Sequence, residues 1–317
     1  MKAIQFSQYG SSEVLQLAER EKPTPRSDEC LIRVRAASVN PIDWKIRSGL
    51  LKHVFRIKLP FIPGYDLCGV VAGKGRSADR FRPGDEVFAM AQGRHAGCYA
   101  EYAAISEGLC VHRPQSLSEI EAAALPLAGL TALQALRDKA GLRRGQHVLV
   151  IGASGGVGHY AVQIAKALGA DVTAVCSTPN ADLVRDLGAH HVVSYPEHDF
   201  LETNTRFDVI LDAVAKHSFG KCAHLLTPHG IYVTTLPGFE VTWRMLFMPL
   251  YSRRRARTLI AKPGGADLAF LARLADEGRL RSVIQEVYPL AEVRTAHDAS
   301  EAGHVRGKLV LALEADT

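Results

Sequence analysis

The 317-residue chain carries a formal net charge of +5, and 47% of its residues are apolar. This length and composition predict one or two globular domains with a sizeable hydrophobic core. The absence of any run of 18 apolar residues excludes a membrane-spanning helix, and the single basic cluster, residues 253–257, is too short to suggest nucleic-acid binding.

The six cysteines indicate a reducing environment. They are scattered along the chain without the Cys-x-x-Cys spacing of a zinc knuckle and without a pattern that suggests disulfides. The N-terminus begins directly with a strand-like pattern, residues 1–6, rather than with the apolar run of a signal peptide. We therefore expect a cytoplasmic protein.

The first 120 residues predict a β-rich domain. Apolar and polar side chains alternate over residues 31–36, and further short strands are expected at 69–72 and 86–89. Gly/Pro turns separate these strands, at Pro63-Gly64 and at Pro83-Gly84. The pattern predicts a compact, partly open barrel.

Strands and helices alternate in the middle of the chain. A helical segment begins at Ser118, which has the spacing of a capping box with Glu121. Strands are then expected at 147–151, 172–176, 191–194, 207–211 and 230–234, mainly with helices between them. This alternation is typical of a doubly wound parallel sheet. The segments after Pro263 break the rhythm, which indicates a return to the first domain.

A glycine turn follows the first of these strands. Gly152, Gly155 and Gly158 come after four apolar residues and before a helix that continues to Leu168. Glycines at this point let the backbone approach a phosphate and let the helix pack closely on the sheet. The free N–H groups at the helix start form an anion site. The turn therefore predicts a dinucleotide-binding site.

The end of the second strand favours NADPH over NADH. An acidic residue at that position binds the ribose 2′-hydroxyl of NAD, but here the strand is followed by Ser-Thr-Pro-Asn, residues 177–180. These side chains can donate hydrogen bonds to a phosphate, and they equally fit an N-cap of the next helix. No arginine or lysine lies in this loop. Tyr195, Arg306 and Lys308 are candidates to supply the missing charge or donors.

Several short motifs resemble the zinc-independent medium-chain dehydrogenases/reductases of the quinone oxidoreductase group. They occur in order along the chain: Asn40-Pro-Ile-Asp43, Pro63-Gly-Tyr-Asp66, Gly84-Asp-Glu-Val87, Gly97-Cys-Tyr-Ala-Glu-Tyr102, Leu125-Pro-Leu-Ala-Gly-Leu-Thr131, Gly152–Gly158 and Gly303-His-Val-Arg-Gly-Lys308. The Cys-Ser-Thr turn, Tyr195 and the tail motif resemble in particular the reticulon-4-interacting-protein-1-like NADPH oxidoreductases.

The resemblance implies a fold and an activity. A GroES-like β-barrel catalytic domain is expected at residues 1–122 and 263–317, enclosing a Rossmann NADP-binding domain with a doubly wound α/β sheet at 123–262. The active site is expected in the cleft between the domains, and a homodimer is implied. The expected activity is hydride transfer from NADPH to a small hydrophobic quinone or α,β-unsaturated carbonyl compound.

The resemblance also assigns cofactor-binding roles. They fall on Ser154, Gly155, Gly156 and Val157 for the pyrophosphate, on Ser177 and Tyr195 for the adenosine phosphate, on Thr131 and Leu236 for the nicotinamide side, and on His304, Val305 and Arg306 in the tail. Two of these have structural alternatives. Arg306 also fits an exposed surface arginine, and the hydroxyl of Thr131 also fits a bond to its own helix backbone.

Zinc is not expected. Zinc alcohol dehydrogenases carry Cys where this chain has Asn40 or its neighbours, and Gly-His-Glu where it has Gly64-Tyr65-Asp66. Of the four closely spaced cysteines of a structural zinc site, only Cys98 and Cys110 fall in the corresponding region. Thiolate and imidazole ligands are therefore missing from both sites. Without a Lewis acid an alcohol is a poor hydride donor, which favours reduction of an already activated acceptor.

Asn40, Asp43 and Tyr65 are the catalytic candidates, and each has a structural alternative. Asn40 fits a group that orients a substrate carbonyl or the nicotinamide ribose, but Asn-Pro-Ile-Asp is equally a good helix start. Tyr65 fits a proton or hydrogen-bond donor, but also a packed ring beside Pro63-Gly64. The apolar segment 239–251 fits an acceptor pocket, a dimer surface or core.

Two alternative functions stay open. Related enoyl-thioester reductases carry a tyrosine where this chain has Leu51, which disfavours an enoyl-thioester substrate and leaves no dedicated proton donor. The missing donor also keeps open an NADPH-binding sensor, adaptor or assembly protein with little turnover.

Overall fold

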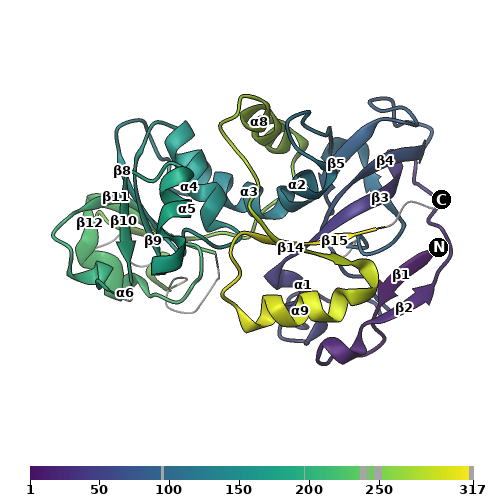
Figure 1. Cartoon of the computed structure of the whole chain (residues 1–317), viewed down its shortest axis with the longest axis horizontal. Helices are drawn as coiled ribbons and strands as arrows, with labels where there is room; N and C mark the ends of the chain where they lie inside the picture. The colour runs from purple at the N-terminus through teal and green to yellow at the C-terminus, as the bar shows by residue number, and fades with distance from the viewer. Residues whose placement is uncertain (94–95, 196, 236–240, 242, 246–251, 314–317) are drawn as a thin grey trace. The chain divides into compact units, whose positions relative to one another are not determined.

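The computed structural model describes residues 1–93, 96–195, 197–235, 241, 243–245 and 252–313. The chain divides into two compact units, residues 1–128 with 263–317 and residues 129–262. The N-terminal and C-terminal segments therefore belong to one unit, and the middle of the chain forms the other (Figure 1).

The second unit is built on a parallel sheet. Its six described strands lie in the order β10-β9-β8-β11-β12-β13. Their bounds are β8 His147–Ile151, β9 Asp171–Cys176, β10 His191–Ser194, β11 Phe207–Asp212, β12 Leu226–Thr234 and β13 Arg255–Thr258. From the β8–β11 pair, successive strands of the sequence are added toward both edges of the sheet: β9 and β10 beside β8, and β12 and β13 beside β11. The predicted doubly wound fold is confirmed, and its topological switch point, where ligands bind in such sheets, lies between β8 and β11.

Helices pack against this sheet through their apolar faces. Helices α4 (Gly158–Ala167) and α5 (Ala181–Asp186) contact β8, β9 and β10, whereas α6 (Phe219–Cys222) and the π-helical turn Gln134–Lys139 contact β11 or β12. Figure 1 shows α4 and α5 together on one side of the strands and α6 on the other. Ala161, Ile164 and Ala165, at helical spacing on α4, are fully buried.

The first unit is β-rich. Its main sheet has the order β14-β15-β3-β4-β5-β7, with β6 paired to β3, and β1 and β2 form a separate hairpin. The bounds are β1 Lys2–Gln5, β2 Gln16–Glu19, β3 Glu29–Val39, β4 Asp66–Lys74, β5 Glu86–Met90, β6 Tyr102–Ser106, β7 Cys110–His112, β14 Ile284–Pro289 and β15 Lys308–Ala312. Because β15 pairs with β3, the end of the chain completes the sheet that its beginning starts.

Five helices accompany this unit in the described residues: α1 Pro41–Arg47, α2 Glu119–Ala124, α3 Pro126–Leu133, α8 Gly265–Asp276 and α9 Val293–Ala302. The capping box predicted at the start of α2 is confirmed, with the N–H of Ser118 donating to Glu121 at 2.9 Å and the N–H of Glu121 to the Ser118 hydroxyl at 3.3 Å. α3 crosses from the first unit into the second. Fully buried Arg47 ties α1 to α9 by its ion pair with Glu301 at 2.5 Å.

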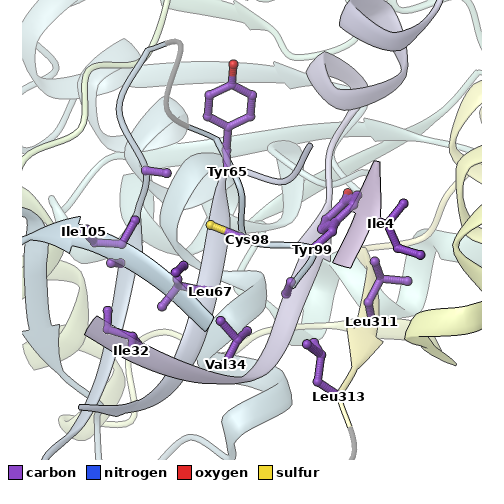
Figure 2. Close-up of a cluster of buried hydrophobic side chains, with 14 of the residues drawn as sticks. Ile4, Ile32, Val34, Tyr65, Leu67, Cys98, Tyr99, Ile105, Leu311 and Leu313 are labelled. Carbon is purple, nitrogen blue, oxygen red and sulfur yellow. The ribbon is translucent and has the colours of Figure 1, made fainter. Parts of the chain in front are cut away.

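The core of the first unit lies between its strands and helices. Figure 2 shows side chains from several strands converging there, among them Ile4, Ile32, Leu67 and Leu311.

The six cysteines are buried free thiols. In the residues that the structure describes, no helix has the length and apolar character needed to cross a membrane.

Replacing Gly158 by Ala tests the contact between α4 and the sheet. The new Cβ would lie 2.0 Å from the carbonyl oxygen of Gly152, so the helix must shift. We expect a loss of about 2–4 kcal/mol in the free energy of unfolding. Gly108→Ala is the control, because its Cβ would meet nothing closer than 3.9 Å. Urea unfolding followed by circular dichroism compares the two, and equal midpoints would contradict this packing.

Candidate functional site

The glycine turn joins the end of β8 to the start of α4. Gly152 has a φ of 75°, a left-handed conformation that favours glycine. The close approach of Gly158 to the Gly152 carbonyl lets the helix begin directly on the turn. The N-cap residue, Val157, has no polar side-chain atom to bond the first helical N–H groups. The N–H of His159 already donates to the carbonyl of Gly155 at 3.1 Å, so the N–H groups just before it are the ones suited to an anion such as a pyrophosphate.

The predicted pyrophosphate residues, Ser154 to Val157, lie half-buried in this turn. Ser177 and Tyr195 follow the neighbouring strands β9 and β10, and the structure brings them together, because the Tyr195 N–H donates to the carbonyl of Cys176 at 3.1 Å. The Tyr195 side chain is 53% exposed. Val214 and Ile260, which follow β11 and β13, are also exposed large apolar residues at the carboxyl edge of the sheet.

A second turn at this edge is held by Asp212. Its carboxylate accepts from the N–H groups of Val214 at 3.2 Å, Ala215 at 2.8 Å and His217 at 2.9 Å, and from the hydroxyl of Tyr232 at 3.0 Å. Asp212 is fully buried. A Cβ on Gly152 would lie 2.4 Å from the Val214 side chain. The two turns therefore touch at the topological switch point, and the glycine makes room for this contact.

The remaining predicted cofactor residues fall in three places. Thr131 lies buried in α3. His304, Val305 and Arg306 belong to the first unit, in the connection between α9 and β15. There His304 has a φ of 64°, and the Arg306 N–H donates to Gln285 at 2.6 Å. Leu236 lies outside the described residues.

Asn40 and Asp43 meet at the start of α1. The Asp43 carboxylate accepts from the backbone N–H of Asn40 at 2.8 Å and from the hydroxyl of Tyr99 at 3.0 Å. The amide nitrogen of Asn40 donates to Asp66 at 2.9 Å, and the Ser38 hydroxyl donates to the same Asp66 oxygen at 2.7 Å. Exposure of Asn40, Asp43 and Asp66 is at most 1%. The N-P-x-D motif is thus both a helix start and one part of a buried polar network.

Lys308 supplies the positive charge of this network. Its ammonium donates to the amide oxygen of Asn40 at 2.6 Å, and the side chain is 3% exposed. The expectation that Lys308 reaches a cofactor phosphate is wrong, because its ammonium is buried against Asn40. Burial lowers the pKa of Lys308, whereas the charges of Asp66 and Asp43 raise it.

The two buried carboxyls resist ionisation. Burial raises the pKa of Asp43 to about 7, against hydrogen bonds from Asn40 and Tyr99, and the charge of Asp66 raises it further. Burial also raises the pKa of Asp66, which Lys308 and hydrogen bonds from Ser38, Asn40 and Leu127 oppose. One oxygen of Asp43, Oδ1, has no hydrogen-bond partner among the described residues. The network is therefore short of donors at Asp43, which favours its protonated form.

Tyr65 lies beside this network but bonds elsewhere. Its hydroxyl donates to the carbonyl of Gly93 at 2.9 Å, and the residue is 3% exposed. Figure 2 shows its ring at the edge of the apolar cluster, pointing away from the other labelled side chains, with the hydroxyl at the far end. Burial and the charge of Asp43 raise the pKa of the Tyr65 hydroxyl, so it is a donor rather than a base.

The donor set does not fit zinc. Asn40, Tyr65 and Asp66 offer an amide, a phenol and a carboxyl, so neither a thiolate nor an imidazole is offered by these three side chains. The ammonium of Lys308 bonds directly to Asn40, and a metal cation beside it would be repelled. In the described part of the chain, no group of three His, Cys, Asp or Glu side chains has an arrangement that fits a metal ion.

Two family profiles match the chain. The alcohol dehydrogenase GroES-like domain matches residues 26–115, and the zinc-binding dehydrogenase domain matches residues 187–311. The chain is 36% identical over 322 residues to the chloroplast envelope quinone oxidoreductase homolog of Arabidopsis thaliana, and the match covers 98% of each protein. The chain belongs to the quinone oxidoreductase group of the medium-chain dehydrogenases/reductases.

Other similar proteins support the same family assignment. The mouse mitochondrial NAD(P)H oxidoreductase RTN4IP1 is 34% identical, with 98% of this chain and 89% of that protein covered. The tomato 2-methylene-furan-3-one reductase is also 34% identical, with 98% and 79% covered. The solved structure of the quinone oxidoreductase from Coxiella burnetii superposes with a TM-score of 0.89 at 37% identity, and 99% of each chain is covered. The predicted resemblance and the predicted GroES-like and Rossmann folds are confirmed.

Sequence reasoning missed the partners that hold the site together. Asp66 lies in the quoted motif Pro63-Gly-Tyr-Asp66, where an acid at the start of an apolar strand signals a buried partner. Asp212 gave a similar signal, as an acid at the end of the strand beginning at Phe207. Lys308 gave none, because it lies 268 positions from Asn40 and a lysine is ordinarily exposed.

Lys308→Met tests the charge balance of the network. The variant leaves Asp43 and Asp66 buried without their cation, so we expect a loss of about 3–5 kcal/mol in the free energy of unfolding. Lys74→Met, which breaks the exposed pair with Asp79, is the matched control and should cost at most about 1 kcal/mol. In Lys308→Met with Asp66→Asn part of the loss should return. Equal losses for the two lysine variants in urea unfolding would contradict the network.

Asp43→Asn tests the raised pKa of Asp43. Because the pKa of Asp43 is about 7 in the folded chain and 3.8 in its reference state, the folded state binds more protons between these values. Stability from this group is therefore present below about pH 4 and is lost as pH rises through 7. Relative to wild type, Asp43→Asn should gain stability from pH 5 to pH 8, by up to about 3 kcal/mol. A pH-independent difference in urea unfolding would show that Asp43 ionises normally.

Proposed function

We propose that this protein is a metal-independent oxidoreductase that uses NADPH to reduce a quinone or an α,β-unsaturated carbonyl compound. The observation that carries the proposal is the pair of touching turns at the switch point of the sheet, where Gly152 packs on Val214 beside the uncapped start of α4. That arrangement suits a dinucleotide. The names of the relatives support both acceptor classes, since one is a quinone oxidoreductase and another reduces a conjugated enone.

The residues that we assign to the cofactor in this proposal are those that the family resemblance names. The pyrophosphate is bound by Ser154, Gly155, Gly156 and Val157, and the adenosine phosphate by Ser177 and Tyr195. The nicotinamide is contacted by Thr131 and Leu236, and the cofactor is covered by His304, Val305 and Arg306. The nicotinamide, when bound, supplies a hydride from its C4. The protein positions the acceptor and excludes water.

The preference for NADPH rests on the loop after β9. Ser177, Thr178 and Asn180 offer hydroxyl and amide groups, and no acid belongs to the loop itself. In the structure the amide of Asn180 donates to the Ser177 hydroxyl at 2.9 Å, which leaves the proton of that hydroxyl to be donated to a phosphate oxygen. Tyr195 stands exposed on the adjacent strand end.

Metal independence rests on Lys308. Its ammonium fixes a positive charge beside Asn40 and Asp66, where zinc dehydrogenases have ligands, so the fold needs no metal at this place. Asn40, Asp43 and Tyr65 then act as positioning residues, because their hydrogen bonds run to other protein groups. Without a Lewis acid the acceptor must already be electrophilic, as quinones and enones are. The proton that completes the reduction comes from solvent.

Two alternatives have support from particular residues. The side chain at the position of the enoyl-thioester reductase tyrosine is Leu51, which is apolar and partly buried in the core, so an enoyl thioester is the weaker substrate. Asn40, Asp43 and Tyr65 are each at most 3% exposed, so none of these three groups is exposed as a proton donor. That feature favours an NADPH-binding sensor, adaptor or assembly protein if turnover is absent.

The assembly and compartment are further parts of the proposal. A homodimer is proposed from the family, and the apolar segment 239–251, which bears on the dimer or the acceptor pocket, lies mostly outside the described residues. A reducing compartment such as the cytoplasm is supported by six buried free thiols. The Arabidopsis and mouse relatives are named as chloroplast and mitochondrial proteins.

Acceptor-dependent oxidation of NADPH tests the function. We expect turnover with ortho- and para-quinones and with small enones, at rates of about 1–1,000 per second, and little or none with enoyl thioesters or simple alcohols. Absorbance at the nicotinamide band follows the reaction. Tight NADPH binding without oxidation by any acceptor would instead select the sensor or adaptor.

Removal of metal tests the proposed metal independence. Because Lys308 supplies the cation, dialysis against a zinc chelator should leave NADPH oxidation unchanged, and elemental analysis should find no stoichiometric zinc before or after. Loss of activity on chelation, restored by zinc, would contradict the proposed role of Lys308.

A further inference from the structure

The loops after β9 and β10 bring an unexpected acid to the proposed adenosine site. The hydroxyl of Thr178, in the loop after β9, donates to the carboxylate of Glu197, after β10, at 3.0 Å. The same hydroxyl lies 2.6 Å from the hydroxyl of Ser194. Since Thr178 has one proton and gives it to Glu197, Ser194 must be the donor in the second contact. Ser194 therefore donates to Thr178, and Thr178 donates to the carboxylate of Glu197.

A cavity of about 400 Å³ opens beside these hydrogen bonds. Its polar lining comes from the two loops and from the face of α5 that covers β10, namely Thr178, Asp182, Arg185, Ser194, Glu197 and His198. The position is the carboxyl end of β9, where doubly wound folds bind the adenosine ribose. The cavity therefore holds charged groups of both signs at the point that separates NADPH from NADH.

We propose that Glu197 is the residue that limits discrimination between the two cofactors, and that Arg185 opposes it. This inference rests on the proposed function, because it concerns the same cofactor site. The ionised carboxylate of Glu197 accepts a hydrogen bond from a ribose hydroxyl but repels a ribose phosphate. Glu197 follows β10, the strand next to the one that carries the acid in NAD-binding folds, so it does not belong to the acid-free loop at 177–180.

Arg185 is the cation that the loop after β9 lacks. It lines the cavity from α5 and pairs with Asp182 at 2.7 Å, an interaction in which the two side chains are 58% and 100% exposed. An exposed pair of this kind contributes little stability. The Arg185 guanidinium is therefore able to exchange Asp182 for a phosphate, which it binds well in a bidentate manner.

Equilibrium titrations with NADPH and NADH, followed by cofactor fluorescence, test the inference without any acceptor. Glu197→Gln keeps the hydrogen bond from Thr178 and removes the charge, so the ratio of the NADH Kd to the NADPH Kd should rise by about tenfold. Arg185→Gln should lower that ratio by a similar factor through weaker NADPH binding. Glu202→Gln, a change at an exposed acid on the same connection, should leave the ratio as in wild type.

The outcomes separate this inference from the proposed function. Binding of both cofactors with the ratio unchanged in Glu197→Gln would overturn the role of Glu197 and leave the proposed function intact. Failure of the wild-type protein to bind either cofactor would overturn both. A changed ratio in Glu202→Gln equal to that in Glu197→Gln would also overturn the inference, because the effect would then be one of general charge.

Discussion

The amide of Asn40 is held from both sides, by the ammonium of Lys308 and by the carboxylate of Asp66. These groups come from the end of β3, the start of β15 and the start of β4, so one buried side chain joins the beginning of the chain to its end. The surrounding structure depends on this balance of charges. Two buried carboxyls and one ammonium are tolerable only because their hydrogen bonds are nearly complete and because Asp43 accepts a proton readily.

The same network relates the fold to the chemistry. A dehydrogenase with zinc polarises its substrate through the metal. Our proposal gives no role to a metal here, because the network offers an amide, carboxyls and an ammonium but neither a thiolate nor an imidazole. In our proposal the nicotinamide therefore supplies the hydride, and the protein determines which cofactor and which acceptor bind. In the second unit, Asp212 and the glycines fix two touching turns at the edge of the sheet. Our further proposal is that Glu197 and Arg185 influence which cofactor binds at that edge.

Periodicity and glycine spacing were sufficient to predict the doubly wound sheet, because a parallel sheet covered on both faces requires apolar runs and a tight turn before each helix. The capping box at Ser118 was equally local. The contacts of Lys308 and Glu197 were not predictable in this way, because each joins residues that only the tertiary fold brings together. Lys308 was considered only as a source of charge for the loop at 177–180, because its distance from Asn40 in the sequence gave no sign of their contact. Glu197 follows the neighbouring strand, so the composition of the loop at 177–180 did not include it.

The central claim is hydride transfer from NADPH to an activated acceptor in a protein that holds no metal. The most direct measurement uses NADPH deuterated at the nicotinamide C4, with metal-depleted protein and a small enone. The account predicts that deuterium appears on the β-carbon of the saturated product, that the α-carbon takes its proton from solvent, and that the rate shows a primary isotope effect. Product without deuterium, or reduction that begins only when zinc is added, would contradict it.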